Sequence, residues 1–159
     1  MNTIRVVWGS GTGPTRMAAY DAALAAAGVE NYNLVVVSSV IPAAVPVDVV
    51  GTAPDLGPAG GRLTVVEARA TGAGPTSVSA ALGWVESVDD GPGLIYESAG
   101  ALAPGVVERR VREGLDAGGA LRDWTLSEPV VQVQEASADS DEHAAAVVLA
   151  VYGQSEPIL

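Results

Sequence analysis

The most informative residues of this chain are two serines, whose hydroxyl groups are potential nucleophiles at the end of an apolar strand. A strand rich in valine and leucine is predicted over residues 33–39, and it closes on Ser38 and Ser39. Pro42 follows shortly afterwards, and a proline cannot donate a hydrogen bond to a neighbouring strand. Taken alone, such a pair is typical of a strand end or a turn, so chemistry at this point has to be indicated by other residues.

Glu97 is a carboxylate at the end of an otherwise apolar strand, which is predicted over residues 94–98. Burial at such a position raises the pKa of a carboxyl group, so that it keeps a proton available for donation. The alternative is a charge that faces solvent, which is the usual arrangement for a glutamate at a strand end.

Asp21 is a second carboxylate in apolar surroundings. It follows Met17 by four residues and precedes Leu24 by three, so the three side chains share one face of a predicted helix. An aspartate within such a stripe is costly unless it is paired, and an incoming cation would pair it. Pairing with an arginine of the chain, Arg5 or Arg16, and simple exposure are the alternatives.

The hydrophobic pattern predicts a single α+β domain in which helices cover sheets. Helices are predicted over residues 15–27 and 104–121, the first with Thr15 as its N-cap and Gly28 as its left-handed terminator. Residues 77–85 fit either a strand or a short helix. Strands are predicted over residues 4–8, 33–39, 63–70, 94–98, 130–135 and 144–152, with a short one near 47–50.

Residues 9–13, Gly-Ser-Gly-Thr-Gly, stand between a predicted strand and a predicted helix. We expect a tight turn that uses the freedom of glycine at positive φ. A nucleotide-binding loop is the alternative, but Pro14 falls where the third glycine of G-x-G-x-x-G belongs. The chain also has no lysine for a P-loop.

Composition narrows the possible functions. The net charge of −11 disfavours a nucleic acid partner, because an acidic surface repels phosphates. All eight basic residues are arginines, and this acidic, lysine-free composition also fits proteins from a high-salt cytoplasm. The chain has no cysteine, and its only histidine, His143, is predicted in an acidic loop, so no metal site is expected.

The beginning of the chain and its longest apolar stretch indicate where in the cell the protein is expected. The chain begins at Met1 and enters a strand pattern at once, without a basic or apolar leader, so we expect a cytoplasmic protein. The apolar stretch over residues 144–152 is too short to cross a membrane as a helix, so no membrane partner is expected.

Residues 31–42, Asn-Tyr-Asn-Leu-Val-Val-Val-Ser-Ser-Val-Ile-Pro, resemble the self-cleavage site of the pyruvoyl-dependent arginine decarboxylases. The resemblance covers nearly the whole chain, including the helix of Asp21, the segment Gly-Leu-Ile-Tyr-Glu that ends at Glu97, and the helix before Trp124. It implies a four-layer α-β-β-α sandwich that assembles into trimers or dimers of trimers. Sites shared between neighbouring subunits are expected from the family and from closed symmetric assembly.

The same resemblance implies that the chain makes its own cofactor. The Ser39 hydroxyl would attack the carbonyl carbon of Ser38, and elimination from the resulting ester, followed by hydrolysis, would release ammonia. Residue 39 would then be a covalently bound pyruvoyl group, which acts as an electron sink for decarboxylation. Within the single domain 1–159, residues 1–38 would become the β chain and residues 39–159 the α chain.

Roles for individual residues follow from the family pattern. Asn33 matches an asparagine that aids processing, although a residue that merely begins a strand is the alternative. Glu97 matches the glutamate that protonates the carbon from which CO2 departs. Asp21, with Met17 and Leu24 beside it, matches the contact to the guanidinium group of the substrate.

With this resemblance, the sequence predicts a self-processing decarboxylase that converts L-arginine to agmatine and CO2. The agmatine would enter polyamine biosynthesis or an agmatine-dependent tRNA modification. One alternative is a pyruvoyl decarboxylase of another amino acid. A second is an unprocessed subunit with a structural or regulatory role in an oligomer, and a third is a small nucleotide-binding module.

Overall fold

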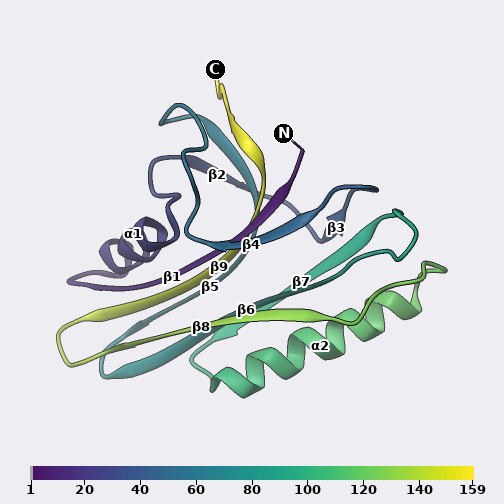
Figure 1. Cartoon of the computed structure of the whole chain (residues 1–159). Helices are drawn as coiled ribbons and strands as arrows, with labels where there is room; N and C mark the ends of the chain where they lie inside the picture. The colour runs from purple at the N-terminus through teal and green to yellow at the C-terminus, as the bar shows by residue number, and fades with distance from the viewer. Residues whose placement is uncertain (1) are drawn as a thin grey trace.

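The computed structural model describes residues 2–159 and shows a single small α+β domain. Within these residues it contains two helices and two sheets (Figure 1). The helices are α1 (Arg16–Ala27) and α2 (Pro104–Ala120). In spatial order, the five-stranded sheet consists of β2 (Asn33–Val36), β5 (Arg62–Ala73), β9 (His143–Glu156), β1 (Ile4–Gly13) and β4 (Val47–Gly51). The four-stranded sheet consists of β3 (Val40–Ile41), β7 (Gly93–Gly100), β6 (Thr76–Val85) and β8 (Val130–Ala138).

Three apolar clusters hold these elements together. The first joins α1 to the five-stranded sheet, and the second fills the space between the two sheets. The third joins α2 to the four-stranded sheet. We call the face of each sheet that packs against the other sheet its inner face. Figure 1 shows α1 and α2 on the two sides away from the inner faces.

The central strand β9 explains why residues 144–152 form an almost continuous apolar run. Its even-numbered residues Ala144 to Ala150 belong to the cluster between the sheets, and the odd-numbered residues Ala145 to Val151 pack toward α1. Because successive side chains of a strand point to opposite faces, a strand covered on both sides has to be apolar throughout. His143, expected in the acidic loop, is instead the first residue of β9 and pairs with Gly13 and Ala73.

The prediction of a turn at residues 9–13 is wrong, because β1 continues through Gly13 and pairs with β9 along its whole length. Glycine is required here for close approach rather than for positive φ. A Cβ built on Gly11 would lie 2.6 Å from the Cβ of Ala22 and 2.7 Å from the nitrogen of Ala23. A Cβ on Gly9 would clash with α1 still more severely, and one on Gly13 would lie 2.8 Å from the nitrogen of Ala19. The three glycines therefore let the helix lie directly on the strand, and no turn remains that could hold a nucleotide.

The ends of α1 are as predicted. The side chain of Thr15 accepts a hydrogen bond from the backbone N–H of Ala18 at 3.1 Å, and Gly28 ends the helix at φ 81°. Residues 77–85, for which strand and helix were both open, are strand. The two-residue strand β3 was not predicted.

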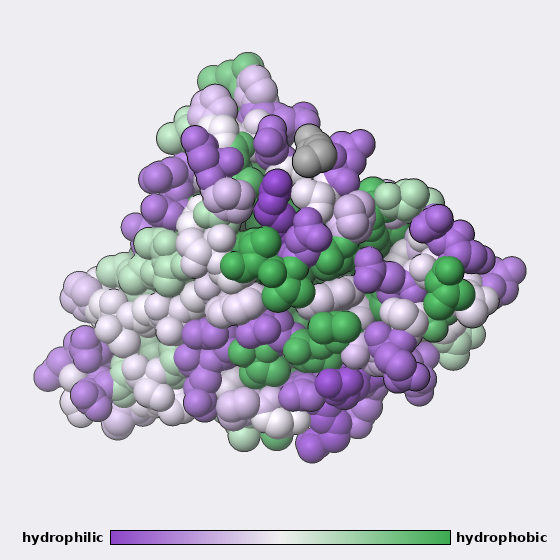
Figure 2. Space-filling model, viewed as in Figure 1, coloured by the Kyte–Doolittle hydropathy of each residue, from purple (hydrophilic) through white to green (hydrophobic). Residues whose placement is uncertain are grey.

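Large apolar side chains are exposed at the edges of the sheets. Figure 2 shows hydrophobic groups interrupting a largely hydrophilic surface on the face seen in Figure 1. The exposed large apolar residues of the edge strands and of the crossing between β2 and β3 are Val35, Val36, Val37, Val40, Val49, Val50 and Val130. Among residues 2–159, no helix is both long enough and apolar enough to cross a membrane.

Candidate active site

The bond between Ser38 and Ser39 lies where the chain crosses from one sheet to the other. The edge strand β2 of the five-stranded sheet ends at Val36, and the edge strand β3 of the four-stranded sheet begins at Val40. Ser38 is exposed and Ser39 is partly buried. The strand predicted over residues 33–39 therefore ends early, because the chain has to leave β5 in order to reach β7.

Backbone hydrogen bonds hold this crossing on both sides. Before the serines, the N–H of Val37 donates to the carbonyl of Val65 in β5 at 2.8 Å. After them, the N–H of Ile95 in β7 donates to the carbonyl of Ser39 at 2.8 Å. The Ser38–Ser39 peptide bond therefore lies between two backbone hydrogen bonds, one to each sheet.

Glu97 lies two positions beyond Ile95 on β7, within the strand rather than at its end as predicted. The alternation along β7 places its side chain on the inner face, with Ile95 on one side and Ala99 on the other. Its Cα is about 7 Å from that of Ile95, which itself contacts Ser39. Because β3 is only two residues long, it leaves this part of the inner face open, and Glu97 is exposed in the single chain.

Partial burial of its carboxyl group against the inner face raises the pKa of Glu97, while a hydrogen bond from its own backbone opposes this effect. A carboxyl group with a raised pKa retains its proton to higher pH, as a proton donor must. The structure therefore places Ser39 opposite Ile95 of β7, two residues from Glu97 on that strand, and the pKa of Glu97 is raised, as expected from the sequence.

Asn33 lies at the far end of β2, away from Ser39. Its side-chain amide donates to the carbonyl of Gly60 at 2.7 Å, and its backbone N–H donates to the carbonyl of Gly61 at 2.8 Å. Six residues of extended chain cover about 20 Å. Within one chain, Asn33 therefore anchors the loop before β5 and does not meet the serine pair.

Met17, Asp21 and Leu24 share one face of α1, as their spacing predicts. Together with Ala18 and Tyr20 they line a shallow hollow of about 380 Å³. Leu24 forms its buried floor, whereas Met17 is 74 % exposed. Asp21 is exposed, and among residues 2–159 no arginine lies within ion-pair distance of it. The carboxylate is thus not paired with Arg5 or Arg16, and in the single chain it is exposed, which was the other alternative.

The two groups of predicted site residues lie on opposite faces of the five-stranded sheet. Helix α1 packs on the face away from the other sheet, whereas Ser39 and Glu97 lie on the side of the inner faces. A single chain therefore does not bring Asp21 to Glu97. A site that uses both must combine Asp21 of one copy with Ser39 and Glu97 of another.

A polar cluster that the sequence did not reveal lies beside the α1 hollow. The hydroxyl of Tyr20 donates to the carboxylate of Glu67 at 2.5 Å, and the guanidinium of Arg69 lies 4.7 Å from the centre of the Tyr20 ring. Burial, followed by this contact with Glu67, raises the pKa of Tyr20 to about 12. Glu67 and Arg69 are two residues apart on β5 and therefore share one face of the strand. This spacing was the only feature of the sequence that could have indicated the cluster.

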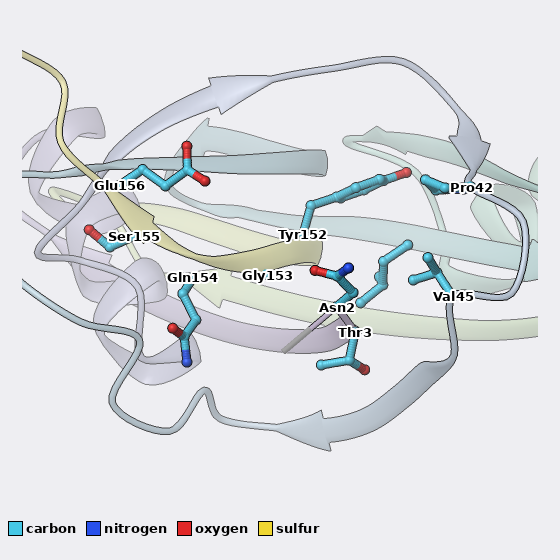
Figure 3. Close-up of a pocket in the computed structure, with 10 residues that line it drawn as sticks. Asn2, Thr3, Pro42, Val45, Tyr152, Gly153, Gln154, Ser155 and Glu156 are labelled. Carbon is cyan, nitrogen blue, oxygen red and sulfur yellow. The ribbon is translucent and has the colours of Figure 1, made fainter.

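A second hollow of about 460 Å³ lies next to β3, between the loop that follows it, the start of β1 and the end of β9 (Figure 3). Tyr152 of β9 is part of its wall, and Figure 3 shows its side chain extending toward Pro42. The Tyr152 hydroxyl donates to the carbonyl of Val40 at 2.9 Å. No local pattern predicts this contact, because it joins residues 112 positions apart.

A family model described as pyruvoyl-dependent arginine decarboxylase matches residues 3–157. With nearly the whole chain matched, the protein belongs to the pyruvoyl-dependent arginine decarboxylase family. A relative of that name from Halobacterium salinarum is 57 % identical over 158 residues, which cover 99 % of this chain and 98 % of the relative. Relatives of the same name from Pyrococcus abyssi and Methanopyrus kandleri are 38 % and 32 % identical, over 87 % and 92 % of this chain and 86 % and 93 % of their own length.

Proposed function

We propose that the protein is a self-processing decarboxylase that converts L-arginine to agmatine and CO2. The observation that carries this proposal is the Ser38–Ser39 peptide suspended between the two sheets, with Glu97 close to it on β7, in a chain of this family. These residues fit a pyruvoyl group formed from Ser39, because the carbonyl of residue 39 is already held by the Ile95 N–H and a carboxyl group with a raised pKa lies two residues further along β7.

Maturation begins with Ser39. Its hydroxyl oxygen bonds to the carbonyl carbon of Ser38 as the Ser38–Ser39 amide bond breaks, and the proton moves to the released amine. Elimination then breaks the ester, which leaves a carboxylate on Ser38 and an unsaturated residue 39. Water hydrolyses this residue and ammonia leaves. The products are a β chain of residues 1–38 and an α chain of residues 39–159.

The mature site depends on two parts of β7. A bound pyruvoyl group supplies an electron sink that accepts the charge left when CO2 departs from the substrate. The N–H of Ile95 holds the backbone carbonyl of residue 39, which survives cleavage, and so fixes the orientation of the new chain end. Glu97, whose pKa is raised by burial, donates a proton to the carbon from which CO2 has left.

Substrate selection belongs to α1. The Asp21 carboxylate attracts the guanidinium group, while Met17 and Leu24 contact the methylene chain of the substrate. Because Asp21 and Glu97 lie on opposite faces of a sheet, the site is shared between subunits, in a trimer or a dimer of trimers. Asn33 aids processing in the same shared arrangement. The exposed valines of the edge strands supply apolar surface for such an interface.

The finer architecture that accompanies this proposal is a four-layer α-β-β-α sandwich. It is supported by the three apolar clusters, which join α1 to one sheet, that sheet to the other, and the second sheet to α2. The protein would work in a cytoplasm of high salt concentration, as its net charge of −11 and lack of lysine suggest. Agmatine would enter polyamine biosynthesis.

The proposal is tested by incubating the purified protein with L-arginine at high salt and measuring agmatine and CO2. L-Ornithine and L-lysine serve as competing substrates, and a Ser39→Ala variant serves as the control that cannot form the group. We expect equal amounts of both products from arginine and none from the variant. Release of CO2 from ornithine or lysine in preference to arginine would assign the protein to another substrate. Agmatine formation by the variant would refute the mechanism.

A further inference from the structure

Tyr152 connects the two sheets at the point where the chain crosses between them. As a residue of β9, it pairs through its backbone with Ile4 and Thr64 in the five-stranded sheet. Its hydroxyl nevertheless donates at 2.9 Å to the carbonyl of Val40, the first residue of β3 in the four-stranded sheet. The ring packs against the cluster between the sheets, and Figure 3 shows it directed toward the segment that follows β3.

The bonded residue immediately follows Ser39. Strand β3 has two residues and only one neighbour, β7, with which Val40 pairs opposite Leu94 and Ile41 opposite Gly93. So short an edge strand has few backbone hydrogen bonds to hold it in place. One additional hydrogen bond, worth about as much as any single backbone bond, is therefore a large part of its attachment.

Cleavage between Ser38 and Ser39 would increase the importance of this bond. In the uncut chain, residue 39 is restrained from both directions, by the Val37 bond to β5 and by the Ile95 bond to β7. Once the peptide is broken, the restraint through Val37 is lost. Residue 39 is then a free chain end that is held by Ile95 and, through its neighbour Val40, by Tyr152.

We propose that Tyr152 is a positioning residue, whose hydroxyl fixes the backbone of residue 40 and thereby holds residue 39 in register with Ile95 and close to Glu97. This role rests on the proposed function and adds to it a residue remote in sequence from the cleavage point. The hydroxyl acts through the backbone and does not touch the reacting atoms.

The protonation state of Tyr152 allows its hydroxyl to donate this hydrogen bond at all neutral pH values. Burial raises the pKa of Tyr152 to about 12, so its hydroxyl stays protonated throughout the neutral range. The ring also has a packing role as part of the wall of the hollow in Figure 3. Replacement by phenylalanine keeps the ring and removes only the donor, which separates the two roles.

The first test measures position independently of cleavage. In the uncut Ser39→Ala chain, the amide hydrogen of Ile95 still donates to the carbonyl of residue 39, so its exchange with solvent reports how firmly that residue is held. Adding Tyr152→Phe should speed this exchange about two- to tenfold, the effect of losing one hydrogen bond. The amide of Val37, bonded to β5, should not change. Unchanged exchange at Ile95 would overturn the proposal.

The second test measures function in chains that carry Ser39. Ser155→Ala is the matched control, because Ser155 is also in β9 and its hydroxyl donates to a backbone carbonyl, that of Pro58, at 2.9 Å. Tyr152→Phe should slow cleavage and lower kcat about two- to tenfold while KM stays constant, whereas the control should match the wild type. Equal cleavage rates and kcat in both variants would refute the positioning role. Failure of the wild-type chain to cut would refute the proposed function, and the Ile95 exchange would still decide the role of Tyr152.

Discussion

Replacing Gly11 by alanine should push helix α1 away from the sheet and destabilise the protein. The added Cβ would lie 2.6 Å from the Cβ of Ala22 and 2.7 Å from the backbone nitrogen of Ala23. Carbon atoms pack at about 3.5–4.0 Å, so the helix has to move by about 1 Å. Overpacking of this kind costs about 1–3 kcal/mol of unfolding free energy.

Thermal unfolding of the uncut Ser39→Ala chain measures this cost. For a chain of this size, 1 kcal/mol shifts the midpoint by about 2–4 °C, so Gly11→Ala should lower it by about 2–12 °C. Gly105→Ala is the matched control, since a Cβ there meets nothing within 4 Å and an alanine in α2 should stabilise by up to about 1 kcal/mol. If Gly11→Ala unfolds at the temperature of its parent chain, the close contact between β1 and α1 is not the reason for the glycines.

Gly11→Ala also tests whether α1 binds the substrate while the serine pair is responsible for self-cleavage. Helix α1 carries Asp21, whereas the cleavage point is held by β5 and β7. The substitution should therefore raise KM for arginine and leave the rate of self-cleavage close to that of the wild type. Slow cleavage with an unchanged KM would contradict the assignment of substrate binding to α1.

Three further predictions concern the reaction itself. Glu97→Gln should be cut normally but decarboxylate about 10²- to 10⁴-fold more slowly, because it has no proton to give; turnover within tenfold of the wild type, measured as CO2 release, would remove Glu97 from this role. Because burial raises the pKa of Glu97 and its protonated form is the donor, kcat should fall as pH rises through that pKa. A pH–rate profile of Glu97→Gln that keeps this descending limb would assign the limb to another group. Asp21→Asn should raise KM for arginine about 10- to 100-fold through loss of a charge-assisted hydrogen bond, with cleavage intact, and an unchanged KM would place the guanidinium elsewhere.

Local signals in the sequence were enough for α1. Thr15 and Gly28 occupy its two ends as predicted, because capping depends on residues within one turn of the helix end. The prediction for residues 9–13 was wrong because a glycine-rich run is expected both in a tight turn and in a strand that a helix approaches closely. The spacing of two between the glycines, facing the small residues Ala19 and Ala23 of the helix, was the signal that separates the two cases.

The candidate site was predictable only in part, and for a similar reason. The strand patterns placed Ser39 and Glu97 at strand ends, and only the family resemblance singled them out; in the structure, Ile95 of β7 bonds to Ser39 two residues before Glu97. Their supports are the Ile95 N–H and the Tyr152 hydroxyl, which depend on how two sheets stack. No local pattern specifies such contacts between distant parts of the chain, just as none showed that Asn33 binds the loop at Gly60.

The intact mass of the purified protein under denaturing conditions tests the central claim most directly. Cleavage between Ser38 and Ser39 predicts two fragments, residues 1–38 and 39–159. The larger fragment should be lighter than a serine-terminated chain by one ammonia. A single uncut mass that persists after long incubation in concentrated salt would contradict self-processing and, with it, the proposed catalytic mechanism.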